Sequence, residues 1–141
     1  MALKRSKMAG NKAQVNQPDE SLILDYAAKI GVQAKIDGVA KSQIEQIIAS
    51  LENIDDDRLS LLVTSSFAYR QARRGMLGNK GGKTADLIAE AMQALHQRNH
   101  GKEQARKLLG LAKWVYESVE GQYVRPVNSF LEYLKQLAGR R

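Results

Sequence analysis

The sequence contains no cysteine, which removes disulfides, zinc–thiolate sites and thiol catalysis from the chemistry open to it. It also contains no apolar run near the ~18 residues that a membrane span needs. The basic residues among its first twelve positions are not followed by an apolar stretch of signal-peptide length. We therefore expect a cytoplasmic protein in a reducing compartment, with no membrane partner.

Alternating strand patterns are absent and prolines number only two, whereas apolar residues recur at helical spacing almost throughout. The chain of 141 residues is long enough to bury roughly two-thirds of its unfolded surface in one domain. We predict an all-α fold, a single bundle of five or six helices. A flexible basic arm is expected over residues 1–17 and the helical bundle over residues 18–139.

The first helix of the bundle is expected to follow Pro18 and Asp19, over SLILDYAAKI, and to stop at Gly31, with a connector to Gly38. Four later helices each have one apolar face that should form the core. These faces are Ile44, Ile47, Ile48 and Leu51; Ile88, Ala91, Met92 and Leu95; Leu108, Leu111, Ala112, Val115 and Val119; and Val127, Phe130, Leu131, Leu134 and Leu137.

A further helix over residues 58–74 should begin at a run of three aspartates, Asp55 to Asp57, which supply a cap and favourable negative charge. We expect its core stripe to consist of Leu59, Leu62, Val63, Ser66 and Phe67. On that same face, the last turn carries three arginines in place of apolar residues, namely Arg70, Arg73 and Arg74. A single cation is enough to complement the negative end of a helix, so three guanidinium groups there point to a partner.

Charge is unevenly distributed along the chain, whose formal net charge is +7. Residues 19–61 contain nine acidic and four basic residues, whereas residues 70–83 contain five basic residues and no acidic one. Segregation of this kind creates a local positive field that a whole-chain average hides. A polyanionic partner is the leading interpretation, and a solvated surface that keeps the protein soluble is the alternative.

The stretch RRGMLGNKGGKT, residues 73–84, resembles the nucleotide-binding P-loop but departs from it in spacing and context. Counting back from Gly82-Lys83-Thr84, Leu77 stands where the first glycine belongs. The preceding element is a helix, and no sheet is present to position a nucleotide and magnesium for phosphoryl transfer. Nucleotide hydrolysis is therefore disfavoured.

A less demanding use of the same stretch is to bind the phosphates of a polynucleotide. Glycines allow close backbone approach, Lys80 and Lys83 supply charge, and the first amides of the following helix, which Thr84 can cap, favour an anion. The alternative is a floppy loop that contacts nothing.

Other candidate residues have structural explanations that we favour. Tyr69 and Trp114 are interpreted as packing residues and not as base-stacking ones. Basic residues of the fifth helix, Arg106, Lys107 and Lys113, are interpreted as a solvated face. A zinc site at His96 and His100 lacks a third ligand. We find no catalytic centre, and expect no enzyme activity, metal or cofactor.

Two stretches together carry a resemblance to a known family. GVAKSQIEQIIASLENI and LLVTSSFAYRQARRG resemble, in the same order, two successive helices of the Csm-type small subunit of type III CRISPR effector complexes. A later segment, LLGLAKWVYESVEGQYV, resembles the helix that closes that domain. The resemblance covers residues 38–137, and the related Cmr-type small subunit is the nearest alternative.

This resemblance implies a non-catalytic subunit that stacks in several copies along a ribonucleoprotein, contacts the other subunits, and touches the backbone of the guide RNA and target RNA. The RNA-contact residues it implies are Lys41 near the Ser-Gln pair and Arg70, Arg73 and Arg74. Lys80 and Lys83 are added on physical grounds.

Two other classes of function stay open. A free-standing DNA-binding regulator would place a helix in a groove, but a glycine-rich connector is too long for the short turn of a helix-turn-helix motif. A protein-interaction adaptor would make the basic loop incidental.

Overall fold

The computed structural model describes residues 2–78, 81–119 and 124–139, with side chains described from Asp19 onward. These residues form α1 (Ala2–Asp37), α2 (Lys41–Ala49), the short 3₁₀ helix η1 (Ser50–Glu52), α3 (Leu59–Arg73), α4 (Gly81–Gln97), α5 (Lys102–Ser118) and α6 (Phe130–Ala138). The prediction of an all-α bundle is confirmed. The expected helix start after Pro18 and Asp19 is wrong, because α1 already begins at Ala2. The side chains of residues 1–17 lie outside the described part, so the flexibility of the basic arm stays a prediction. No helix described here is long and apolar enough to cross a bilayer.

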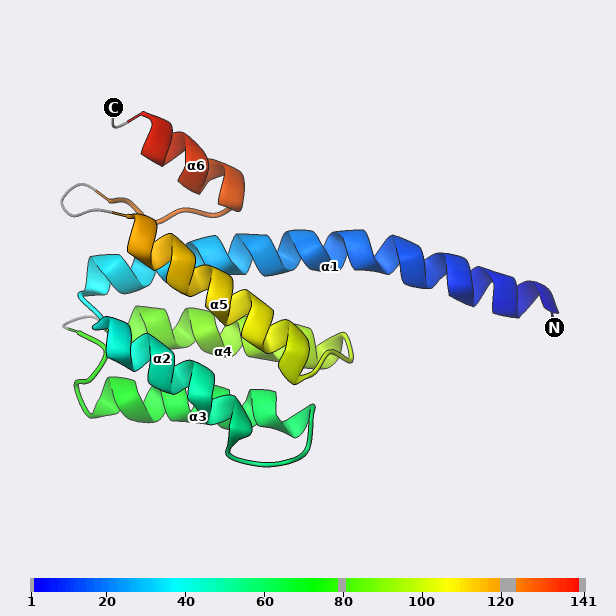
Figure 1. Ribbon diagram of the computed structural model, residues 1–141, viewed down its shortest axis with the longest axis horizontal. Helices are drawn as coiled ribbons and strands as arrows, with labels where there is room; N and C mark the ends of the chain where they lie inside the picture. The colour runs from blue at the N-terminus through cyan, green and yellow to red at the C-terminus, as the bar shows by residue number, and fades with distance from the viewer. Residues whose placement is uncertain (1, 79–80, 120–123, 140–141) are drawn as a thin grey trace.

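The long helix α1 runs across the molecule and is crossed by α5, while α3 and α4 lie side by side and antiparallel below them (Figure 1). The main core lies between α1, α2, α3, α4 and α5, and its largest fully buried side chains include Ile47, Leu61, Met92 and Leu108. A smaller cluster around Val115 and Tyr133 attaches α6 to the opposite side of α1.

The predicted stop at Gly31 is wrong, because α1 continues without a break to Asp37. At Gly31 the backbone of α5 passes so closely that an added Cβ would lie 2.5 Å from the carbonyl oxygen of Ala112 and 2.6 Å from the Cβ of Val115. This glycine therefore serves the crossing of two helices and does not end one. The chain turns instead at Gly38.

The predicted apolar faces of α2, α4 and α5 are confirmed in their main members, since Ile47, Met92 and Leu108 are fully buried and their predicted partners are buried or half-buried. The prediction fails at one residue of α5 and at two leucines of α6, all of which face solvent. Trp114 is 72% exposed, so its interpretation as a packing residue is wrong. In α6, Tyr133 is buried in place of Leu131 and Leu134.

The predicted core stripe of α3 is wrong for three of its five members, since Val63 and Phe67 are half-buried but Leu59, Leu62 and Ser66 are exposed. Phe67 packs against the main core as predicted. Leu59 and Leu62 are 48% and 40% exposed, and the buried face consists mainly of small and polar residues: Ser60, Leu61, Thr64, Ser65, Ala68 and Gln71. Their hydroxyls have partners inside the bundle; the Ser65 hydroxyl donates to the carbonyl of Leu61 (3.0 Å). Because these groups are satisfied, burying them costs little, and Leu59 and Leu62 are left facing solvent.

Two of the three consecutive aspartates serve helix starts. Asp56 accepts hydrogen bonds from the amides of Arg58 (3.0 Å) and Leu59 (2.8 Å), which confirms the predicted cap of α3. Asp57 accepts from the amide of Lys102 (3.2 Å) at the start of α5. One acidic turn thus anchors the starts of two helices.

Asp19 is buried and ties α1 to the far end of α4. It accepts from Arg98 Nη1 (3.0 Å) and lies 2.6 Å from His100 Nε2. His100 is thus held by a carboxylate of its own chain. Among the described residues, no group of three or more acidic or histidine side chains is arranged to hold a metal ion.

The close contact between α1 and α5 at Gly31 can be tested with two Gly→Ala variants, one at the contact and one away from it. Gly31→Ala forces the two helices apart at a cost of about 1–3 kcal/mol, which outweighs the helix-propensity gain of roughly 0.8–1 kcal/mol. Gly110, within α5, has nothing within 4 Å of an added Cβ, so Gly110→Ala should retain the full gain. Urea denaturation should rank Gly110→Ala above the wild type and Gly31→Ala below it. Equal stability of the two variants would contradict the tight crossing.

Candidate nucleic-acid interface

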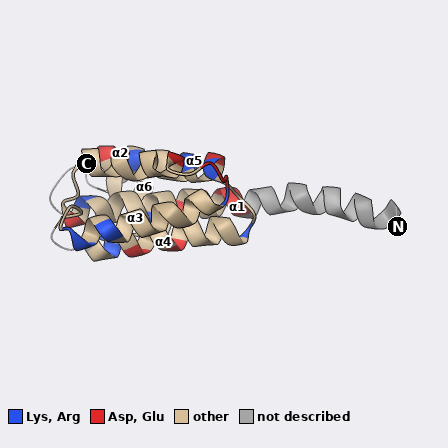
Figure 2. Ribbon diagram, turned by 90° about the horizontal axis from the view of Figure 1, so that it is seen from below, with Lys and Arg blue, Asp and Glu red and all other residues tan. Residues whose placement is uncertain are grey.

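The last turn of α3 presents three exposed arginines, Arg70, Arg73 and Arg74. None of them belongs to the ion pairs that link described residues of the chain. Figure 2 shows cationic segments gathered where α3 ends and α4 begins. The charge of these three arginines is therefore available to a partner, as the sequence predicted. The face of α3 that carries them, which the sequence pattern assigned to the core, is exposed to solvent instead.

Arg70 is held in place by neutral partners. Its Nη1 donates to Gln71 Oε1 (3.0 Å), and Gln71 Nε2 donates to Gln43 Oε1 (2.7 Å) in the buried contact between α3 and α2. This chain of amides orients the guanidinium group without neutralising it. A cation fixed in this way loses less side-chain entropy when it binds an anion.

Lys83 joins the three arginines from the first turn of α4. The hydroxyl of Tyr69 donates to Asp86 Oδ1 (2.9 Å), which sets the antiparallel register of α3 against α4. Lys83 precedes Asp86 by about one turn, so it lies level with the last turn of α3, and it is exposed. We call Arg70, Arg73, Arg74 and Lys83 the arginine surface. Lys80 lies outside the described residues.

The described part of the glycine-rich connector is packed against the bundle. Leu77 is fully buried in the main core. Gly78 has a φ of 76° and rests so tightly on the backbone carbonyl of Asp37 that no other residue fits there. Over residues 74–78, the alternative of a floppy loop that contacts nothing is therefore wrong.

The first turn of α4 already faces an anion of the same chain. Asp37 is buried and accepts hydrogen bonds from the Thr84 hydroxyl (2.6 Å) and from Gln33 Nε2 (2.9 Å). The expectation that Thr84 caps α4 is wrong, since α4 begins three residues earlier and Thr84 binds α1 instead. Because Asp37 occupies a position that favours negative charge, a phosphate is expected on the arginines and not over this turn.

Acidic residues of α4 bound the arginine surface on one side. Asp86 accepts from Tyr69, and Glu90 accepts from the Tyr26 hydroxyl (3.4 Å). The hydrogen bond to Asp86, followed by partial burial, raises the pKa of Tyr69 above its usual value. These carboxylates repel a polyanion, so a nucleic-acid strand would cross α3 and not follow α4.

Lys41, by contrast, is engaged within the molecule. It forms an ion pair with Glu117 (2.8 Å), and one turn along the same two helices Glu45 pairs with Lys113 (2.8 Å). Glu52 continues the series with Lys102 (3.4 Å) and Arg106 (3.2 Å). The structure thus separates Lys41 from the arginines with which the resemblance grouped it.

This α2–α5 ladder was missed from the sequence, although a signal was present. Lys41 and Glu45 are four residues apart, as are Lys113 and Glu117, with the lysine first in both pairs. Such a pattern suits two antiparallel helices, but which helices pair cannot be known before the fold is.

Comparison with known proteins gives no match: no family model, no curated protein and no solved structure resembles the chain significantly. The geometry itself bears on the DNA-binding alternative. In a helix-turn-helix the two helices cross at a large angle, whereas α3 and α4 lie antiparallel (Figure 1). Neither helix is free of the other to enter a groove.

The α2–α5 ladder predicts how stability depends on pH. Hydrogen bonds from Lys113 and Lys41 hold the pKa of Glu45 and of Glu117, respectively, below the ordinary value of 4.5. Their contribution is therefore complete above pH 4.5 and is lost as the pH falls through the folded-state pKa values. Both pairs are exposed, so the effect should be small and should weaken with salt.

The measurement compares wild type with the double variant Glu45→Gln/Glu117→Gln. Thermal unfolding at neutral pH and low salt should show the wild type to be more stable, and this difference should shrink as the pH drops below 4.5. A difference that is unchanged between pH 7 and pH 3 would mean that the carboxylates do not act through these ion pairs.

Proposed function

We propose that this protein is a non-catalytic RNA-binding subunit of a cytoplasmic ribonucleoprotein, and that it holds the sugar-phosphate backbone with the arginine surface. The observation that carries the proposal is the partition of charge. Lys41, Arg106 and Lys113 of α2 and α5 are paired with carboxylates. By contrast, Arg70, Arg73 and Arg74 are exposed and belong to no ion pair among the described residues. Arginine suits phosphate because its planar group donates two parallel hydrogen bonds.

The arrangement favours contact with the backbone over reading of bases. Phosphate contacts fix the register of a strand without reading its sequence. The three guanidinium groups lie within about one helical turn, a span that suits neighbouring phosphates of one strand. The acidic side chains of α4 then set the direction in which that strand can run.

The resemblance to the small subunits of type III CRISPR complexes indicates which kind of ribonucleoprotein the proposed subunit would belong to. In RNA-guided complexes, base pairing between guide and target reads the sequence, so the protein needs cations along a phosphate path and no base-reading helix. The partners would be guide RNA, target RNA and the remaining subunits. The proposal assigns no reaction to this chain.

A single copy should bind RNA weakly and with strong salt dependence. If each of the four cations neutralises one phosphate of a single strand, the slope of log K against log salt is about −2.8. Affinity in an assembly would rise because several copies act on one strand.

The test is charge reversal at Arg73 and Arg74 with a control of equal net charge. Each Arg→Glu change lowers the charge by two, so Arg73→Glu/Arg74→Glu and the control Arg106→Glu/Arg125→Glu both go from +7 to +3. Anisotropy of a fluorescein-labelled single-stranded RNA at increasing salt should show a slope less negative by about 1.4 in the first variant. The control should keep the wild-type slope.

Circular dichroism should stay helical in both variants, because all four positions are exposed. If both variants lose RNA equally, binding follows overall charge and the arginine surface is not the site. A sequence-specific footprint on duplex DNA would contradict the proposal and would support the alternative function, a free-standing DNA-binding regulator.

A further inference from the structure

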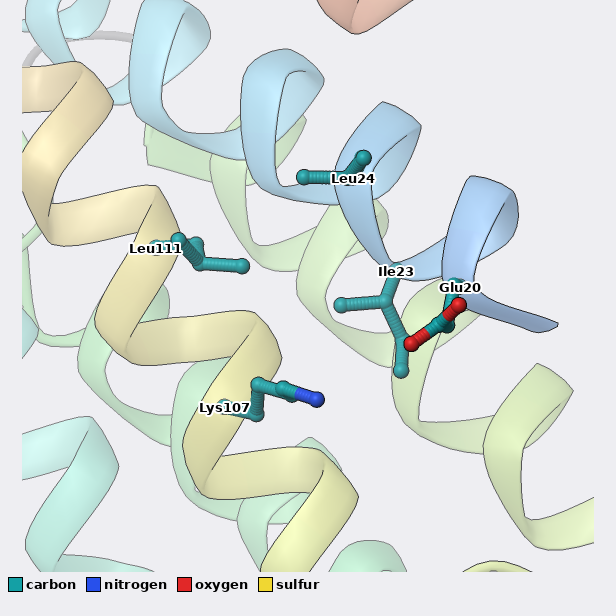
Figure 3. A pocket seen from close by; sticks show the side chains of 5 residues that line it. All are labelled: Glu20, Ile23, Leu24, Lys107 and Leu111. Atoms are coloured by element: carbon teal, nitrogen blue, oxygen red, sulfur yellow. The ribbon is translucent and has the colours of Figure 1, made fainter. Parts of the chain in front are cut away.

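A hollow of about 250 Å³ lies between α1 and α5 (Figure 3). Glu20, Ile23 and Leu24 line it from α1, and Lys107 and Leu111 line it from α5, so that side chains of the two helices face each other across it. Its floor is apolar, and its two walls carry one charge each, of opposite sign. None of these residues belongs to the arginine surface.

Trp114 extends this hollow into a larger apolar surface. It follows Leu111 by three residues on α5, so the two side chains share a helix face, and 72% of it is exposed. It is the single tryptophan of the chain. A tryptophan exposed to this extent beside an apolar hollow is typical of a protein-binding surface, where such residues contribute most of the affinity.

A complementary ridge lies on α6. Leu131 and Leu134 are one turn apart and are 61% and 46% exposed. The start of α6 lies about one turn from the hollow along both of its helices, because Phe130 and Tyr133 pack in one cluster with Ala28 and Val115. These two residues follow Leu24 and Leu111 by four positions each. The ridge and the hollow therefore belong to neighbouring parts of the surface.

We propose that a second copy of this chain occupies the hollow, and that the contact is reciprocal: the Leu131–Leu134 ridge of each copy enters the hollow of the other beside Trp114. The charges agree with this occupant. Glu132 and Lys135 flank the ridge at the same spacing as its leucines, and they match Lys107 and Glu20 on the walls of the hollow. In a two-fold dimer the same surface of each copy provides both interacting parts of the interface. Here one copy provides both the ridge and the hollow.

The dimer goes beyond the proposed function, because it uses none of the arginine surface and does not require RNA. Only a few large side chains are involved, so the association should be weak and concentration-dependent. Sedimentation equilibrium should show the 15.7 kDa chain approaching twice that mass as concentration rises. Over the same range, Trp114 emission should shift to shorter wavelength and its quenching by acrylamide should fall.

The decisive variant removes the ridge. Leu131→Ser/Leu134→Ser should weaken dimerisation roughly tenfold or more, as expected when two leucines lose burial. The matched control is Leu59→Ser/Leu62→Ser, which removes two similarly exposed leucines from α3 and should dimerise like the wild type. A second pair tests the orientation: Glu20→Lys and Lys135→Glu should each weaken the dimer, and their combination should restore it.

Three results would overturn the proposal: a monomer at all concentrations, equal effects of the two serine variants, or assemblies larger than a dimer. Arg73→Glu/Arg74→Glu should dimerise normally. Failure of RNA binding and failure of dimerisation are therefore distinguishable, since each has its own variant and its own readout.

Discussion

The close crossing of α1 and α5 at Gly31 is the constraint on which the rest of the structure depends. Because this residue has no side chain, the α5 backbone at Ala112 comes into contact with α1. Helix α1 then continues to Asp37, where its end supports both Gly78 of the connector and Thr84 of α4. The hollow lies between the same two helices, beside Leu111, and Trp114 is exposed one turn further along α5.

The packing of the helices brings some cationic side chains into ion pairs and leaves others, among the described residues, outside them. The antiparallel approach of α2 and α5 brings each cation of the ladder to a carboxylate, including Lys41. The last turn of α3 projects beyond those partners, and its nearest hydrogen-bond acceptor at Arg70 is a neutral amide. Four exposed cations, Arg70, Arg73, Arg74 and Lys83, therefore gather at one end of the bundle. A polyanion would meet little competition there from carboxylates paired with these groups.

Sequence periodicity predicted the fold class and the apolar faces of α2, α4 and α5, because each of these helices has one stripe of large residues. It failed on α3, where residues with buried hydroxyls such as Ser60 and Ser65 face the core and Leu59 and Leu62 face solvent. Hydropathy cannot anticipate that a hydroxyl will find its partner in a nearby backbone carbonyl. The exposure of the arginines was predicted, but the pairing of Lys41 was not, since it depends on which helices become neighbours.

In the proposed function, the guanidinium groups of Arg70, Arg73 and Arg74 bind phosphate while the ion pairs of the α2–α5 ladder stay formed. Nuclear magnetic resonance of ¹⁵N-labelled protein, titrated with a short single-stranded RNA at low salt, tests this directly through the arginine side-chain Nε–H signals. Contact with phosphate should shift the signals of these three arginines progressively, with the Arg106 signal and the amides around Lys41 unchanged. Shifts centred on Arg106 and Lys41, with the α3 arginines silent, would contradict it.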